Sequence, residues 1–170
     1  YTKPIMSLSE YFPQRWSIKR TDTIMAGDEV QRAVFGSPIT SPKERPDHEL
    51  SFVDAVKFVM NRQPNLSQRS RFVRELRAKI AELCEDKMVP VKFFTAVGTS
   101  LDLRHGADAF FEQVRRIATV DISLREKETH KADVLMVATL DGEGSIVISD
   151  DEISRVARDV ARCLNKKPSH

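Results

Sequence analysis

The apolar pattern of the chain changes its period at Pro90, and this change restricts the possible folds more than any other feature. Before the proline, apolar residues recur every three to four positions, which is typical of amphipathic helices. After it, from residue 91 to 124, β-branched and aromatic residues form short runs that turn-forming residues divide. A helix followed by successive short strands predicts a mixed α/β domain.

Two helices are expected before Pro90. The first covers residues 49 to 61, where Phe52 to Met60 follow a helical spacing and Asn61 to Pro64 end the run. The second covers about residues 67 to 87. Its apolar stripe recurs at steps of three and four residues: Phe72, Val73, Leu76, Ile80, Leu83 and Cys84.

The region after Pro90 predicts an antiparallel meander of three strands. The expected strands are 91–99, 107–112 and 117–124, with turns at Gly106 and at Arg115 and Arg116. A charged connection, 126–130, then leads to an apolar run at 133–140 that suits one buried strand. The turn at 141–144 predicts a hairpin between that strand and a short strand at 145–148.

A last helix is expected to begin after Ser149. Ser149 and Glu152 have the spacing of a capping box, in which the hydroxyl and the carboxylate each accept from the amide of the other residue. An apolar face follows from Ile153 to Leu164, and Lys166, Lys167 and Pro168 mark the end of the helix.

The N-terminal part of the chain has a different texture. Five of the eight prolines lie in the first 46 residues, and no long apolar period runs through them. We therefore expect residues 1–47 to form an extended, irregular arm and 48–170 a single α/β domain. Aromatic and aliphatic residues in the arm indicate that it packs on its own domain or on a neighbouring subunit.

Composition excludes some classes of protein. A length of 170 residues suits one domain with a sizeable core, so its two cysteines are expected to be reduced apolar residues of a soluble, intracellular protein. No apolar run approaches the roughly 18 residues of a membrane helix. A net charge of +2 is too small to identify a partner by itself.

Two acidic residues occupy corresponding places on neighbouring expected strands. Asp108 opens the strand after Gly106, and Asp121 interrupts the apolar strand from Val120 to Ser123. Carboxylates that point the same way from adjacent strands can hold one divalent cation, because Mg²⁺ is usually bound by one or two carboxylates. A metal there could activate water against a phosphodiester.

With these two acids, the order of elements resembles the PD-(D/E)xK, or restriction-endonuclease-like, nuclease superfamily. The resemblance implies a three-layer core, with Asp108 and Asp121 as metal ligands and catalytic residues, Mg²⁺ as cofactor, and Glu75 on the preceding helix supporting the site. The family's lysine would stand two residues after Asp121, where this chain has Ser123. Lys127 or Lys131 would then supply that charge.

Structural interpretations of the same residues stay open. Asp108 has the position of an ordinary turn residue, and Asp121 could form an ion pair with Arg115, Arg116 or Lys131. Glu75 lies four residues before Lys79, which is the spacing of a surface pair on a helix. His105 reads more readily as a loop residue than as a metal ligand, and neither the cysteines nor the other histidines have the spacing of a zinc site.

The densest basic cluster belongs to the second expected helix. It could bind the phosphate backbone of nucleic acid, DNA in the first instance, or it could be a solvated face. Its members are Arg69, Arg71, Arg74, Arg77 and Lys79. No phosphate-binding glycine loop or acyl-transfer motif occurs in the sequence.

The sequence therefore favours a nuclease-like protein that acts on or binds nucleic acid and that, if active, hydrolyses phosphodiesters with Mg²⁺. A catalytically inactive binding or assembly module of the same fold is one alternative. The other is a scaffold protein that forms homo-oligomers through residues 1–47.

Overall fold

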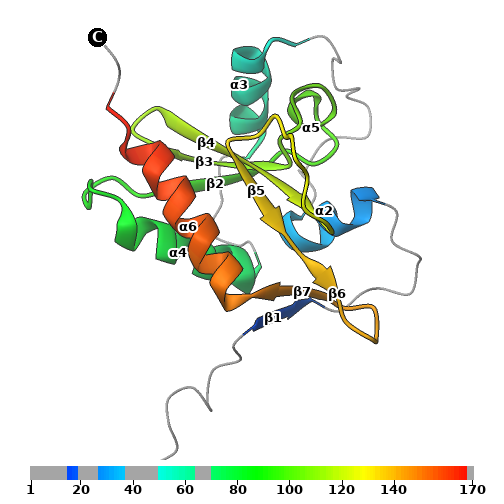
Figure 1. Cartoon of the computed structure of the whole chain (residues 1–170). Coiled ribbons are helices and arrows are strands. Elements are labelled where there is room, and N and C mark those ends of the chain that lie inside the picture. The colour runs from blue at the N-terminus through cyan, green and yellow to red at the C-terminus, as the bar shows by residue number, and fades with distance from the viewer. Residues whose placement is uncertain (1–14, 19–26, 37–49, 64–69, 168–170) are drawn as a thin grey trace, which may run out of the picture.

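The structure is a computed structural model that describes residues 15–18, 27–36, 50–63 and 70–167. This part of the chain is mixed α/β, with two sheets and five helices (Figure 1). The helices are α2 (Gly27–Phe35), α3 (Phe52–Arg62), α4 (Arg71–Leu83), α5 (Ser100–His105) and α6 (Asp150–Asn165). None of these helices is both long enough and apolar enough to cross a bilayer.

The larger sheet has the strand order β2-β3-β4-β5. Its members are β2 (Lys92–Thr95), β3 (Ala109–Gln113), β4 (Arg116–Ser123) and β5 (Val134–Val137). The first three strands form the expected antiparallel meander, and β5 pairs in parallel with β4. Residues 124–133 make the crossover between the two parallel strands without a helix.

Helices cover both faces of this sheet. The larger core lies on the face of α2, α4 and α6, where Phe93 and Phe111 pack with their apolar residues. The smaller core lies on the face of α3 and α5 and contains Phe94 and Phe110. Because side chains alternate along a strand, these neighbouring phenylalanines serve opposite cores.

The smaller sheet has the order β1-β7-β6 and includes part of the expected N-terminal arm. Its strands are β1 (Arg15–Ile18), β6 (Thr139–Leu140) and β7 (Ile146–Ser149). From the same stretch, α2 buries Val30, Val34 and Phe35 in the larger core. The described parts of residues 1–47 thus pack on the domain of the same chain.

Helix α3 is confirmed close to its expected bounds, but two expectations about helices were wrong. Helix α4 ends at Leu83 and not near residue 87, because Cys84 adopts an extended conformation and the side chain of Asn165 binds the Leu83 carbonyl and the Glu85 amide. The short helix α5 was not expected at all. It ends at Gly106, whose φ of +67° suits glycine and whose α-carbon lies against Lys131.

The apolar run at 133–140 was expected to be one strand and is two. It divides at Ala138, whose amide donates to the Ser123 carbonyl, so that β5 belongs to the larger sheet and β6 to the smaller. The hairpin between β6 and β7 is confirmed. A run of apolar residues predicts that a strand is buried, but it does not predict which sheet the strand joins. The division into two strands could therefore not be predicted.

The capping box before α6 is only half formed. The Ser149 hydroxyl accepts from the Glu152 amide as expected, at 3.1 Å. The Glu152 carboxylate does not return to Ser149, because it accepts from the Val137 amide at 2.9 Å and from Arg155. The predicted start of the helix is therefore confirmed, while the Glu152 carboxylate binds a backbone amide at the edge of β5.

Candidate functional site

Asp108 lies directly before β3 and is hydrogen-bonded to the chain on both sides of that strand. Its amide donates to the Val120 carbonyl on β4, and its own carbonyl accepts from Ala96, just past the end of β2. Its side-chain Oδ2 accepts from the Ile122 amide at 2.8 Å. The side chain is 1% exposed, so Asp108 is a fixed, buried carboxyl group and not a surface turn residue.

Asp121 presents the second carboxyl group from β4. It alternates with Val120 and Ile122, which belong to the larger core, so its side chain lies on the opposite face of the sheet. The residue is 8% exposed, and its carboxyl group is hydrogen-bonded to that of Asp108. The two acids expected to converge therefore do so.

Lys127 completes this cluster from the crossover. Its Nζ lies 3.1 Å from Asp121 Oδ2, and its side chain is 43% exposed. The crossover after β4 thus returns an ammonium group to the carboxylate face of that strand. We name Asp108, Asp121 and Lys127 the carboxyl cluster.

Asp108 keeps its proton at neutral pH. Burial favours the neutral acid most, and the hydrogen bond and the charge of Asp121 act in the same direction. The Ile122 amide opposes them, but the pKa of Asp108 is nevertheless raised from 3.8 to about 9. A protonated Asp108 can donate a hydrogen bond to the Asp121 carboxylate.

Other residues that the sequence suggested do not join the cluster. Lys131 donates to the Arg104 carbonyl at 3.3 Å and packs on Gly106. Glu75 forms an exposed pair with Arg71 at 3.0 Å, on a helix of the opposite face. The expectation that Lys131 is a substitute lysine and that Glu75 supports the acids therefore has no geometric support.

Two further residues proposed as partners of Asp121 lie elsewhere in the structure. Arg116 donates to the Leu164 carbonyl at 2.8 Å, and Arg115 occupies the turn between β3 and β4. The His105 ring bonds to the Leu50 carbonyl at 2.9 Å and stacks edge-on against Phe52, so it lies within the described packing of α3 and α5.

The fit of the carboxyl cluster to a divalent cation rests on its donors. Two adjacent carboxyl groups can supply the one or two carboxylates that usually bind Mg²⁺, provided that the cation displaces the proton of Asp108 and the hydrogen bond between the two acids. Among the described residues, no group of three or more acidic, histidine or cysteine side chains is arranged for a metal. A cation here would therefore depend on water for its remaining ligands.

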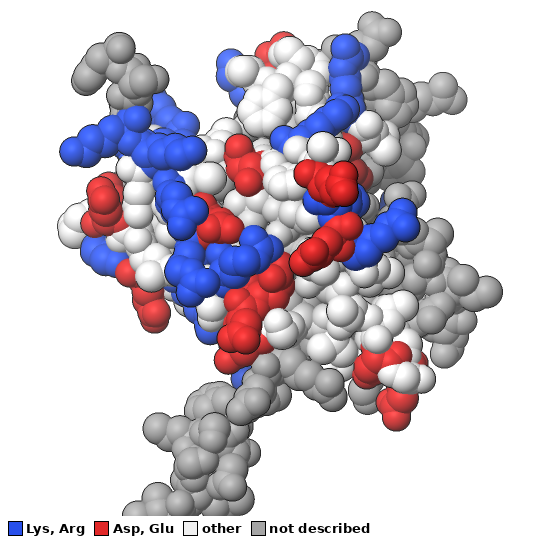
Figure 2. Space-filling model, viewed as in Figure 1, with Lys and Arg blue, Asp and Glu red and all other residues white. Residues whose placement is uncertain are grey.

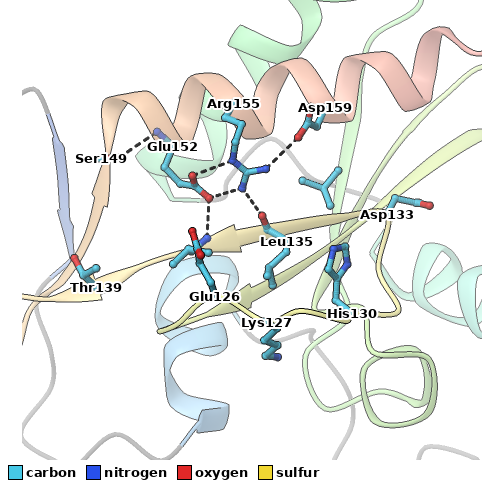
Figure 3. A pocket seen from close by; sticks show the side chains of 12 residues that line it. Glu126, Lys127, His130, Asp133, Leu135, Thr139, Ser149, Glu152, Arg155 and Asp159 are labelled. Atoms are coloured by element: carbon cyan, nitrogen blue, oxygen red, sulfur yellow. Dashed lines mark hydrogen bonds and ion pairs between the residues drawn. The ribbon is translucent and has the colours of Figure 1, made fainter.

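A second charged cluster, absent from the sequence expectations, lies on α6 (Figure 3). Arg155 donates to Glu152, to Asp159 and to the Leu135 carbonyl on β5. These groups line a cavity of about 590 Å³ between α6, β5 and the crossover. We name Glu152, Arg155 and Asp159 the helix cluster; its spacing of three and four residues is too common in helices to have indicated it.

The Glu152 carboxylate is held in its charged form. Burial is the largest single effect and opposes ionisation, but hydrogen bonds from Arg155 and Val137 and the Arg155 charge together outweigh it. The pKa of Glu152 is consequently lowered. This carboxylate anchors α6 to the free edge of β5.

The basic residues of α4 belong to a helix on the face of the sheet opposite the carboxyl cluster. α4 packs beside α6 on the face opposite the carboxyl cluster, and their C-terminal ends meet at Asn165. Cations and carboxylates are interleaved over the α6 face in Figure 2. Arg69 lies outside the described residues, and the remaining cations of the predicted cluster are Arg71, Arg74, Arg77 and Lys79.

Comparisons with known proteins provide no relative. No protein-family model, no curated protein and no solved structure matches this chain.

Proposed function

We propose that this protein is a metal-dependent nuclease whose reaction takes place at the carboxyl cluster. The observation that carries the proposal is the convergence of three residues from separate segments. Asp108 and Asp121 share a hydrogen bond on adjacent strands, and the Lys127 ammonium lies 3.1 Å from Asp121. A buried acid whose pKa is strongly raised by burial and by a second acid is typical of functional sites.

The arrangement of elements supports a restriction-endonuclease-like core. A helix precedes an antiparallel meander, a parallel strand follows, and the acids stand directly before the second strand and on the third. One departure is that the crossover between the third and fourth strands is not helical in this chain. The crossover brings the ammonium group of Lys127 to Asp121. It thereby supplies the positive charge that Ser123 lacks at the position of the family's lysine.

Asp108 and Asp121 would hold the divalent cation, which would stabilise charge on the scissile phosphate and lower the pKa of a bound water. Lys127 supplies a partly exposed ammonium that can orient the attacking water and offset negative charge. The Ile122 amide fixes the orientation of Asp108. Nucleic acid, with DNA as the first substrate to test, fits this combination of groups.

A cleavage assay tests the proposal. The full chain is incubated with supercoiled plasmid and with single-stranded DNA, in Mg²⁺, in Mn²⁺ and in EDTA. We expect nicking that requires a metal and is lost in Asp121→Ala. Asp133→Ala is the matched control, because Asp133 also lies beside β4 but binds the Thr119 amide and hydroxyl.

Cleavage that Asp121→Ala retains would exclude the carboxyl cluster as its source. Binding without cleavage in any metal would instead support the inactive binding module. Loss of an oligomer upon deletion of residues 1–14, again without cleavage, would support the scaffold.

A further inference from the structure

A second cavity adjoins Lys127 on the side away from the helix cluster. It has a volume of about 310 Å³ and lies between α2 and the end of β4. This is at the lower end of small-ligand cavities, which run from about 300 to 1,000 Å³. The cavity has room for one small ligand and not for a double helix.

Its lining combines two kinds of surface. Val30, Ile122 and Leu124 are apolar, while Arg125 and Lys127 bring positive charge. No carboxylate lines this cavity among the described residues. A ligand with an apolar flat part and an anionic part would match both surfaces.

The cavity of the helix cluster has the opposite balance. Lys127, Arg155 and His130 face the carboxylates of Glu126, Asp133, Glu152 and Asp159 there. Acidic groups in that number repel a phosphate, since like charges at short range disfavour binding. Of the two cavities beside Lys127, the one with Arg125 therefore suits the substrate strand.

Gln31 adds a requirement for a hydrogen-bond donor. Gln31 lines the α2 side of this cavity, and its side-chain oxygen is buried and has no partner among the described residues. Buried acceptors are normally satisfied by protein, water or ligand. Every nucleobase carries an N–H donor on its pairing edge, and that edge is available only when the nucleotide is unpaired.

We propose that this cavity, which lies on the α2 face of the sheet and shares Lys127 with the carboxyl cluster, binds one unpaired nucleotide of the substrate strand. Arg125 contacts its phosphate, the apolar residues contact its base, and Gln31 accepts from the pairing edge of that base. The inference rests on the proposed nuclease function for the location of the cleavage site at Lys127. It specifies single-stranded or locally opened nucleic acid as the substrate class.

A binding experiment in EDTA separates this inference from cleavage. A short labelled oligonucleotide, alone and paired with its complement, is titrated with the full chain and followed by fluorescence anisotropy. We expect the single strand to bind more tightly, and Arg125→Ala to weaken that binding by at least about fivefold and to reduce its salt dependence. Gln31→Met should weaken it about two- to tenfold, as expected for one lost hydrogen bond.

Arg158→Ala is the matched control, since Arg158 is an exposed arginine on α6 that lines neither cavity. Far-ultraviolet circular dichroism verifies that each variant is folded. Equal affinity for single strand and duplex, or equal affinities of Arg125→Ala and Arg158→Ala, would overturn the inference even if cleavage occurs. Arg125-dependent preference for the single strand would support it even if Asp121→Ala retains cleavage, which would refute the proposed function alone.

Discussion

The two charged clusters lie at neighbouring strands of the larger sheet, but the pKa values of their buried carboxyl groups shift in opposite directions. In the helix cluster, Glu152 accepts from Arg155 and from the Val137 amide, and its pKa is lowered. In the carboxyl cluster, Asp108 lies against a second acid, and its pKa is raised to about 9. Burial opposes ionisation of both groups, but it dominates at Asp108, whereas hydrogen bonds from Arg155 and Val137 and the Arg155 charge outweigh it at Glu152.

This difference separates a structural site from a candidate functional one. Glu152 and Arg155 occupy each other's hydrogen-bonding capacity and fasten α6 to the edge of β5. Asp108 and Asp121 repel each other when both are charged, and burial makes that arrangement costly unless a proton or a cation intervenes. Stability alone would not favour such a pair, which is the physical reason to look for function there.

The largest expected effect concerns the lysine of the carboxyl cluster. Lys127→Ala should lower the rate of metal-dependent cleavage by about 10²- to 10³-fold, as for the loss of one preorganised charge-stabilising group. Lys131→Ala should leave that rate unchanged, because Lys131 binds the Arg104 carbonyl. Single-turnover cleavage rates of the two variants measure the difference, and equal rates would remove Lys127 from the mechanism.

The next effect concerns the stability of the helix cluster. Arg155→Met should lower the free energy of unfolding by about 2 kcal/mol, because it leaves Glu152 and the Leu135 carbonyl without their charged donor. Urea denaturation measures this loss. The same substitution at Arg158 is the control, and losses of similar size would mean that the hydrogen bonds of Arg155 contribute nothing specific.

A pH-dependent effect on stability is expected in the carboxyl cluster without metal. The raised pKa of Asp108 means that, above its unfolded value of 3.8 and up to about 9, the folded state binds a proton that the unfolded state has released. Stability therefore falls as pH rises through that window, by at most about 1.4 kcal/mol per pH unit. Asp108→Asn removes this dependence.

Urea denaturation in EDTA at pH 5 and at pH 8 measures that effect. We expect Asp108→Asn to gain stability relative to the original chain as the pH rises. If the free energy of unfolding changed with pH in the same way in both proteins, Asp108 would ionise normally. The carboxyl groups of the two clusters would then not differ in the way described above.

The smallest effect sets a baseline for both clusters. Arg71 and Glu75 form an exposed pair on α4, with side chains 73% and 44% exposed. A double-mutant cycle with alanine at both positions should give a coupling energy below about 0.5 kcal/mol. The same cycle at Glu152 and Arg155 gives the coupling energy of the partly buried pair. Equal coupling energies would show that burial does not make the Glu152–Arg155 pair stronger than the exposed one.

Much of the fold was predictable because it depends on local patterns. The stripes of α3, α4 and α6 and the three-stranded meander follow from apolar periodicity, and the start of α6 follows from Ser149. Helix α5 was missed because six residues are too few for a helical period. The division at Ala138 was missed because both halves of that run are apolar.

The candidate site was predictable only in part, for a similar reason. Adjacent antiparallel strands place Asp108 and Asp121 near each other by register, which the order of strands already implied. The choice of Lys127 over Lys131 depends on how the crossover runs, and no periodicity describes such a segment. Gln31 and Arg125 are far apart in the chain, so the sequence offered no sign that they line one cavity.

The amino-acid sequence by itself determined the kinds of element, their order and the presence of an acid on each of two neighbouring strands, because these depend on propensity and spacing over a few residues. Only the tertiary structure decided which sheet receives each strand, which lysine reaches Asp121, and that the α4 cations lie on the other face. Those outcomes depend on packing between segments that are distant in the chain. Burial between such segments also raises the pKa of Asp108, so in its proposed role this residue must release its proton when the cation binds.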